Sequence, residues 1–411
     1  MISYKKSIKI LSKSKIKIKN ENILTKNTSY RICAKNIYSS NNYPAANNTA
    51  FDGFAINSKD ARNISKKNTK KFKIIKTIAA GDNPNIKIIK KFSTIEVMTG
   101  AIIQKPFDTV IPIEKIKFLP SKKNKKYILI NKKINKNEHI RFLGSDYKKG
   151  QKIISKGQLI KPAHIMALKT LGIKKIQVKK KINLNFYSTG NEITNKDKIP
   201  LWKVRNSNIY YLSSLTKYMP INFKEKIILR DNDEKKFKKE LIKNIKSNTN
   251  IIVTSGAVSA GKYDFVPNVI KKFKLKNYFK GVAIRPGKPI TFAKFIKNKV
   301  FFGLPGNPIS SAACFRFFIL PFLMRSLEMA KEKPIYARLK NSFSKKKNFT
   351  RFIKGKLNTT KKGTTEFEVL KGQESFKINS LTKANSWALF PSGKSYLKKG
   401  VIVECYLISP F

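Results

Sequence analysis

Three short phrases rich in Gly and Pro, two of them placed directly after apolar runs, constrain this chain more than any other feature. They are TSGAVSAG at 254–261, RPGKP at 285–289 and LPGNP at 304–308. The first follows the run 250–253, whose β-branched residues are typical of a buried parallel strand. Ligands of open α/β sheets bind at the carboxyl ends of the strands, so this pattern predicts an α/β fold with a binding site there.

The residue types in these phrases suit an anionic ligand. A Gly/Ser loop exposes backbone N–H groups with no side chain in the way, which favours phosphate. Asn307 is expected to cap the next helix and Pro308 to take its first position, so that free N–H groups form a second anion site. Arg285 and Lys288 add positive charge on a Pro-Gly turn. Each phrase alone is more often a plain turn, but the three together favour a binding site.

The net charge of +65, from 88 basic and 23 acidic side chains among 411 residues, suggests nucleic acid or an anionic membrane. The lysines are nevertheless spread through every segment and interleaved with Ile and Asn. No aromatic–basic repeat or nucleic-acid motif accompanies them. We therefore interpret the charge as composition bias that raises non-specific affinity for polyanions, and we predict no specific nucleic-acid partner.

The remaining composition favours a cytoplasmic protein without a membrane partner. The run 1–20 has no continuous apolar segment of the secretory kind. The longest apolar stretch, 309–324, is interrupted by a charge and a proline, is shorter than a membrane span, and is interpreted as a buried helix. The cysteines and histidines are too dispersed for a disulfide framework or a zinc site, which fits a reducing compartment: Cys33, Cys314, Cys405, His139 and His164.

Hydrophobic patterning divides the chain into regions. Residues 1–45 are expected to be helical in pieces, and 51–143 to be β-rich. Strands and helices alternate over 181–327, which predicts a parallel sheet covered on both faces, and short strands fill 328–411. The strand candidates in the two β-rich regions are 71–78, 86–89, 93–98, 109–113, 127–131, 367–370, 375–378, 387–391 and 401–407.

Further phrases recur along the chain, and with the first three they resemble the motifs of the molybdopterin molybdenumtransferase family, the molybdate insertases of the MoeA and gephyrin-E type. The resemblance covers nearly the whole chain. Phe54, Ser145, Asn191 and Arg285 stand where the family has Tyr, Glu, Asp and Lys. The additional phrases are DGFA (52–55), AGD (80–82), VMTGA (97–101), RFLGSD (141–146), STGNE (188–192) and ANSW (384–387).

The resemblance implies a multidomain α/β plus β fold in an elongated subunit. It implies a discontinuous N-terminal domain, 1–45 plus 144–180, that receives an inserted β-rich domain, 46–143. A doubly wound, molybdopterin-binding α/β domain of the MogA-like type, 181–327, and a small C-terminal β-barrel-like domain, 328–411, would follow.

The resemblance also implies an enzyme of molybdenum cofactor biosynthesis, a molybdopterin molybdotransferase. It would insert molybdate into adenylylated molybdopterin and release AMP, as a homodimer with a shared active site. Mg²⁺ would be held by Glu192, Asp231 and Asp264, which are expected to act in catalysis together with Arg285 and Lys288. The implied substrate-binding residues are Asp52, Thr99, Arg141, Asp146, Ser188, Thr189, Gly190, Ser255, Gly256, Pro305, Gly306, Asn307 and Pro308.

Two other functions remain open at this point. A molybdopterin adenylyltransferase shares the α/β domain, but it needs neither residues 1–180 nor the last domain. A non-catalytic scaffold or polyanion-binding protein would use the positive charge alone, and its binding would vanish with salt.

Overall fold

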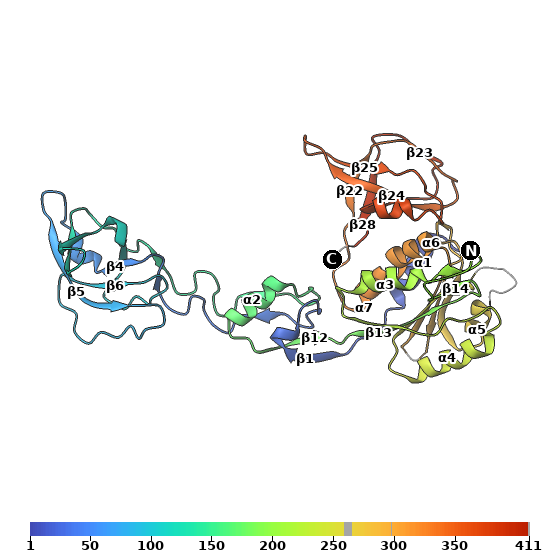
Figure 1. The fold of residues 1–411 in the computed structure, drawn as a ribbon, viewed down its shortest axis with the longest axis horizontal. Helices are drawn as coiled ribbons and strands as arrows, with labels where there is room; N and C mark the ends of the chain where they lie inside the picture. The colour runs from blue at the N-terminus through green and yellow to red at the C-terminus, as the bar shows by residue number, and fades with distance from the viewer. Residues whose placement is uncertain (259–264, 297, 410–411) are drawn as a thin grey trace. The chain divides into compact units, whose positions relative to one another are not determined.

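The computed structural model describes residues 1–258, 265–296 and 298–409, and the chain forms two compact units within it (Figure 1). The larger unit contains residues 1–35, 155–161 and 175–411, and the smaller unit contains residues 36–154 and 162–174. The chain therefore leaves the larger unit twice and returns twice. The division into four domains stays a prediction.

The smaller unit is built on a six-stranded mixed sheet with the order β7-β4-β6-β5-β9-β8. Its core contains side chains such as Phe54, Phe72 and Ile128, which are fully buried. Short strand pairs and one helix complete the unit. Its elements are β2 (Ile37–Tyr38), β3 (Asn48–Thr49), β4 (Gly53–Ile56), β5 (Lys70–Ile78), β6 (Ser93–Val97), β7 (Thr109–Pro112), β8 (Lys117–Pro120), β9 (Lys125–Ile130), β10 (Ile140–Arg141), β11 (Lys152–Ile154) and α2 (Pro162–Thr170).

The larger unit begins with α1 (Tyr4–Lys13), and its first strand β1 (Asn20–Leu24) pairs antiparallel with β12 (Lys175–Lys179). Ser3 caps α1 by accepting a hydrogen bond from the backbone N–H of Lys6 (3.2 Å). The first 45 residues were expected to be helical in pieces, and they contain β1, β2 and a short 3₁₀ turn besides α1. These strands form by pairing with β12 and β11, which lie far along the chain. Local sequence does not reveal such distant partners.

The centre of the larger unit is a six-stranded sheet with the order β16-β13-β17-β21-β20-β18. The first four strands are parallel, as predicted, but β20 runs antiparallel to both of its neighbours, β21 and β18, so the sheet is mixed. These two strands form a meander with β21 that needs no crossover helix. The strands are β13 (Ile182–Ser188), β16 (Ile221–Glu225), β17 (Ile251–Ser255), β18 (Leu275–Lys280), β20 (Thr291–Phe295) and β21 (Val300–Leu304).

Helices cover both faces of this sheet, α4 and α5 on one face and α3, α6 and α7 on the other (Figure 1). Helix α5 begins at Val266. The short pairs β14 and β15 follow β13. The bounds are α3 (Ser207–Thr216), α4 (Glu234–Lys246), α5 (Val266–Lys271), α6 (Pro308–Cys314), α7 (Leu320–Ser326), β14 (Ile193–Thr194) and β15 (Val204–Arg205).

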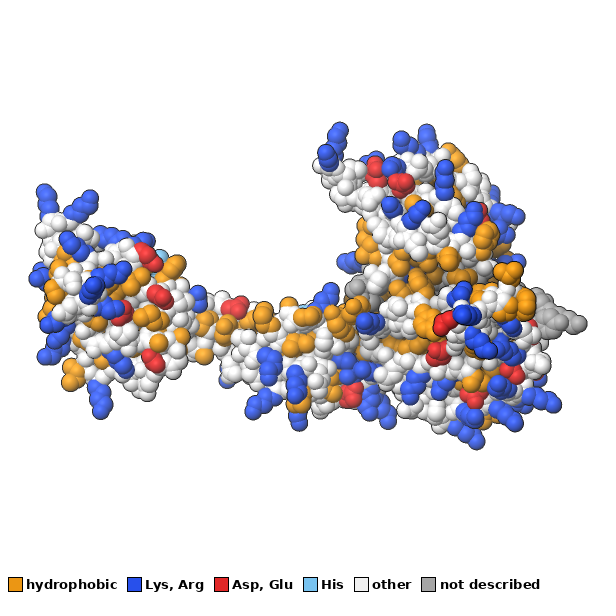
Figure 2. Space-filling model, in the orientation of Figure 1, with side chains coloured by type: hydrophobic (Ala, Val, Ile, Leu, Met, Phe, Trp, Pro, Cys, Tyr) orange, Lys and Arg blue, Asp and Glu red, His pale blue; other side chains and the backbone are white. Residues whose placement is uncertain are grey.

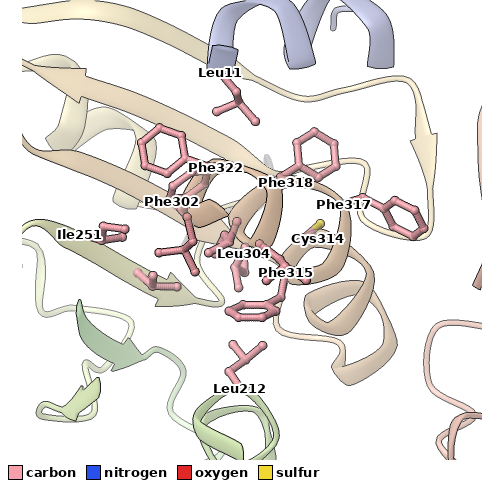
Figure 3. Close-up of a cluster of buried hydrophobic side chains, with 14 of the residues drawn as sticks. Leu11, Leu212, Ile251, Phe302, Leu304, Cys314, Phe315, Phe317, Phe318 and Phe322 are labelled. Atoms are coloured by element: carbon pink, nitrogen blue, oxygen red, sulfur yellow. The ribbon is translucent and has the colours of Figure 1, made fainter. Parts of the chain in front are cut away.

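A π-helical segment, Phe315–Ile319, joins α6 to α7, so one helix runs over 19 residues from Pro308 to Ser326. Its length and composition would allow it to cross a membrane, which corrects the expectation that the apolar stretch is too short. However, 89% of its most apolar window is buried inside the protein. Figure 3 shows its phenylalanines packed with residues of α1, α3 and the sheet. We conclude that it is the core helix that was predicted.

The C-terminal region closes into a five-stranded barrel, because β24 pairs with β26 as well as with β25. The strand β19 (Ile284–Arg285) of the α/β region pairs parallel with β24 and is thereby attached to this barrel. The other elements are β22 (Ile335–Leu339), β23 (Phe343–Ser344), β24 (Thr350–Thr359), β25 (Thr365–Val369), α8 (Asn379–Lys383), β26 (Ser386–Phe390), β27 (Tyr396–Leu397) and β28 (Ile402–Leu407).

Two strand predictions are wrong. In both segments, a side chain forms hydrogen bonds with backbone groups that would otherwise pair with a neighbouring strand. Residues 86–89 are not a strand; the Gln104 amide binds both the N–H and the C=O of Ile86, at 3.0 and 3.4 Å. Residues 375–378 curl around the buried Lys354, whose Nζ donates to the carbonyls of Gly372, Glu374 and Lys377.

Candidate functional site

A cavity of about 330 Å³ lies where β13, β17 and β21 end, at the carboxyl edge of the parallel strands. This is where loops and helix N-termini of an α/β sheet converge. Seven of the predicted site residues line it together: Ser188, Thr189, Glu192, Ser255, Gly306, Asn307 and Pro308. The other lining residues are Ile193, Val204, Arg205, Asn206, Ser207 and Asn208.

The loops after β13 and β17 are packed against each other so closely that only glycine fits. Gly256 has φ +105°, and a Cβ there would stand 2.3 Å from Thr189 Oγ1 and 2.6 Å from the Thr189 carbonyl oxygen. Thr189 in turn donates from its backbone N–H and its hydroxyl to the Ser255 carbonyl, both at 2.9 Å. The predicted Gly190 also has positive φ, at +132°. Gly190 and Gly256 do not line the cavity themselves, but they hold the two loops beside it in a fixed shape.

Two asparagines at the start of α3 tie the cavity walls together. Asn208 donates from Nδ2 to Ser255 Oγ (2.7 Å) and to the Gly306 carbonyl (2.8 Å). Asn206 accepts a hydrogen bond from Ser188 Oγ at 2.7 Å. Because these bonds join the ends of β13, β17 and β21, the loops keep their spacing without a ligand. The sequence analysis missed both residues.

Arg230, which was also missed, organises the loop that carries Glu192. Its guanidinium donates to the carbonyls of Gly190 (3.2 Å), Asn191 (3.2 Å) and Ile193 (2.9 Å). Three carbonyls facing one cation turn the corresponding peptide N–H groups away from it. Arg230 thus fixes the loop in the conformation in which Glu192 reaches the cavity.

Two of the three candidate Mg²⁺ ligands are described, and both lie next to Asn191. Glu192 lines the cavity, and its carboxylate makes no ion pair or hydrogen bond within the described ranges. The backbone N–H of Asp231 donates to Asn191 Oδ1 at 3.3 Å. Asp264 lies outside the described residues. No three His, Cys, Asp or Glu side chains of the described chain form a metal-binding group. Mg²⁺ usually takes one or two carboxylates and otherwise water and phosphate, so the Glu192 carboxylate at the cavity suits it. Asp231 does not line the cavity.

The first turn of α6 differs from the prediction. Asn307 is the N-cap residue and Pro308 holds the first helical position, but the Asn307 side chain makes no capping hydrogen bond. The Ile309 N–H donates to the Ser375 carbonyl at 3.4 Å. Pro305, predicted as a site residue, contributes its carbonyl oxygen, which accepts from Ser311 Oγ at 2.7 Å. The turn is therefore partly satisfied within the protein.

Arg285 is the last residue of β19, Lys288 lies on the turn that follows, and neither lines the cavity. Both are exposed, and the Arg285 guanidinium lies 5.0 Å from the centroid of the Phe349 ring. Arg285 pairs in register with Arg351 of β24. Burial and then the charge of Arg285 lower the pKa of Arg351, and its Nε has no hydrogen-bond partner in the described parts of the chain. Two adjacent arginines concentrate positive charge that can bind an oxyanion, and this Nε of Arg351 is itself buried.

The predicted residues of the smaller unit fall into two places. Asp52 Oδ1 accepts hydrogen bonds from the Thr99 N–H (2.6 Å) and hydroxyl (2.7 Å), and these two bonds lower the pKa of Asp52. Arg141 lies on β10, and Asp146 follows it in a turn where its N–H donates to the Tyr43 carbonyl. Both side chains are exposed.

A cavity at the carboxyl ends of the parallel strands is typical of α/β proteins that bind a small ligand on the loops of the sheet. Three family models match the chain. Residues 2–172 match the MoeA N-terminal region (domain I and II), 185–325 a probable molybdopterin binding domain, and 336–408 the MoeA C-terminal region (domain IV).

Relatives and solved structures agree with these models. The molybdopterin molybdenumtransferase of Staphylococcus epidermidis is 32% identical over 410 residues, which cover 99% of this chain and 95% of the relative. The one of Staphylococcus aureus is 31% identical over 380 residues, 92% and 88% of the two chains. The crystal structure of a molybdopterin biosynthesis MoeA protein from Pyrococcus horikosii matches with a TM-score of 0.81 and 25% identity, and the match covers 100% of both chains. The chain belongs to the MoeA family of molybdopterin molybdenumtransferases.

Proposed function

We propose that this protein inserts molybdate into adenylylated molybdopterin and releases AMP. The observation that carries the proposal is the cavity at the ends of β13, β17 and β21, in which seven residues singled out from the sequence lie together. Its position at the carboxyl ends of the parallel strands, beside the N-terminus of α3, suits a phosphate group. The membership of the whole chain in a family of molybdenumtransferases supports the same reaction.

The residues of this chain divide the chemistry between two places. The phosphates lie against the loops at Ser188 and Ser255, and the asparagines of α3 keep these loops in place. Glu192 and Asp231 would hold Mg²⁺. When bound, Mg²⁺ supplies positive charge that stabilises the phosphates as the anhydride breaks. Arg285, Lys288 and Arg351 bind molybdate, the oxyanion substrate, through charge and guanidinium N–H groups.

Molybdate-dependent AMP release from adenylylated molybdopterin tests the reaction. We expect release that requires both molybdate and Mg²⁺ and that falls at least a hundredfold in Glu192→Gln protein. Glu366→Gln, in the barrel strand β25, is the control and should keep full activity. Rapid adenylylation of molybdopterin from Mg-ATP without molybdate would instead assign the chain as an adenylyltransferase.

We propose further that the protein works as a homodimer and that Asp52, Thr99, Arg141 and Asp146 serve the active site of the partner subunit. A closed two-fold dimer presents the same surface twice, so two equivalent sites would form. Mixing inactive Asp52→Ala protein with inactive Glu192→Ala protein should restore part of the activity, because one site of a mixed dimer carries both native residues. Mixed dimers verified by an affinity tag that stay inactive would contradict this arrangement.

A further inference from the structure

An exposed apolar pair lies close in sequence to residues that line the cavity and has no role in the site described so far. Leu201 and Trp202 have relative exposures of 103% and 76%, and they stand in the turn just before β15. The chain has two tryptophans, and the other one, Trp387, is completely buried. Single exposed apolar residues are ordinary, so the position of Trp202 has to carry the argument.

Hydrogen bonds attach the turn that carries Trp202 to the loop that carries Glu192. The next residue, Lys203, donates from Nζ to the Asn191 carbonyl at 2.5 Å, and the Val204 N–H donates to the Glu192 carbonyl at 2.8 Å. Val204 also pairs with Ile193 in the β14–β15 ladder. Trp202 is therefore only two residues from a residue that lines the cavity, and its backbone is anchored to the loop of Glu192.

The cavity offers many polar groups that suit a phosphate and few apolar residues that could contact an aromatic ring. Its lining is dominated by hydroxyl, amide and charged groups, and the apolar residues among them are Ile193, Val204 and Pro308. A volume of about 330 Å³ lies at the lower end of the range for small-molecule sites. A substrate that carries two fused heterocycles on either side of two phosphates cannot fit inside it entirely. With its phosphates on the loops, a ring must lie at the rim.

We infer that the indole of Trp202 is the platform on which a planar heterocycle of the substrate stacks. This inference rests on the proposed function, because that function supplies the ring. Indole has the largest apolar face among side chains, and base stacking on an aromatic side chain contributes substantially to binding. Trp202 is thus a substrate-positioning residue that acts on affinity, while Glu192 acts on the reaction.

Kinetics of Trp202 variants test the inference. Trp202→Ala should raise KM for adenylylated molybdopterin about ten- to hundredfold with kcat nearly unchanged, since stacking is the same before and during reaction. Trp202→Phe keeps an aromatic face and should recover most of the affinity. Tyr336→Ala removes an exposed aromatic ring from the barrel and should change nothing. An unchanged KM in Trp202→Ala protein would overturn the inference.

Fluorescence gives a readout that does not need turnover. Trp202 is the exposed fluorophore, so AMP or a pterin monophosphate should quench the emission of the wild type and protect it from iodide, and neither should affect Trp202→Phe protein. Quenching by AMP alone assigns the adenine ring, and quenching by the pterin alone assigns the pterin ring.

If the wild type releases no AMP, the proposed function fails, while this titration still tests the platform. A loss of the dimer in Trp202→Ala protein, without quenching of the wild type by either ligand, would place the indole at a subunit interface and overturn the inference.

Discussion

The cavity at the end of β13 and the turn at Arg285 are built in opposite ways. The cavity is formed from backbone, glycines and short polar side chains, and hydrogen bonds within the protein hold every loop around it. The Arg285 turn offers cations on long side chains with few partners. The difference suggests that a phosphate is recognised by shape and a small oxyanion by charge. Substitutions around the cavity should therefore change the unfolding free energy and the rate of AMP release. Substitutions at the Arg285 turn should instead change KM for molybdate.

The largest effect is expected from Gly256→Ala, which disrupts the packing of the two loops beside the cavity. The added Cβ would overlap Thr189 atoms at a φ of +105°, so the free energy of unfolding should fall by about 2–3 kcal/mol and AMP release should nearly cease. Urea unfolding and the AMP assay measure the two. Gly393→Ala is a matched control, with φ +97° and nothing within 4 Å, and should cost only about 1 kcal/mol. Equal effects in both proteins would show that close packing at Gly256 is unimportant.

Arg230→Ala should have the next largest effect, because it releases the loop of Glu192 from three carbonyl contacts. We expect a loss of about 1–3 kcal/mol in unfolding free energy and a fall in kcat. Arg230→Lys, which keeps the charge but lacks the planar guanidinium, should lie in between. Arg338→Ala on the exposed side of β22 controls for the lost charge. A full-rate Arg230→Ala enzyme would contradict a positioning role.

At the other place, Arg285→Ala should raise KM for molybdate by about tenfold, roughly the effect of one charge-assisted hydrogen bond. Stability should hardly change, because Arg285 is exposed. Arg285→Lys should restore much of the affinity, since charge matters more than shape here. Steady-state kinetics at varied molybdate concentration and at high salt would measure this effect. A raised KM for the pterin substrate alone would contradict the assignment of molybdate binding to the Arg285 turn.

The smallest effect concerns an ion-pair cluster that serves the fold only. Hydrogen bonds from Lys179 and Lys156 lower the pKa of Glu328 from 4.5 to about 2. A carboxylate with a lowered pKa in the folded state stabilises the protein above pH 4.5, and this contribution disappears as the pH falls from about 4.5 to 2. Glu328→Gln should therefore reduce acid sensitivity in this range and leave KM for molybdate unchanged. An equal acid transition in both proteins would argue against it.

The sequence was sufficient to predict which strand ends meet. Ser188, Ser255 and Asn307 each follow an apolar run, and the ends of parallel strands must share one edge. Arg230, Asn206 and Asn208 could not be found in this way, because an arginine or asparagine that binds carbonyls looks like any solvated residue. An Asn-x-Asn at the start of a helix was the only available signal.

The fold was predictable where local periodicity decides it and unpredictable where a distant side chain does. The core helix from Pro308 and the strand β17 follow from apolar patterning. The failed strands at 86–89 and 375–378 have strand-like composition, but Gln104 and Lys354 bind their backbones instead. The antiparallel β18 and β20 depend on pairing choices that strand propensity does not encode.

The interrupted path of the larger unit has a consequence for its synthesis. β1 pairs with β12, and the Ile16 N–H donates to Ser326, so the first segment depends on residues made much later. At translation rates of ~5–20 residues per second, β1 waits roughly 8–30 s for its partner strand. The smaller unit is complete at residue 174, before that partner emerges. A nascent chain should therefore carry a finished smaller unit while its own N-terminal helix and strand are still unpaired on the ribosome.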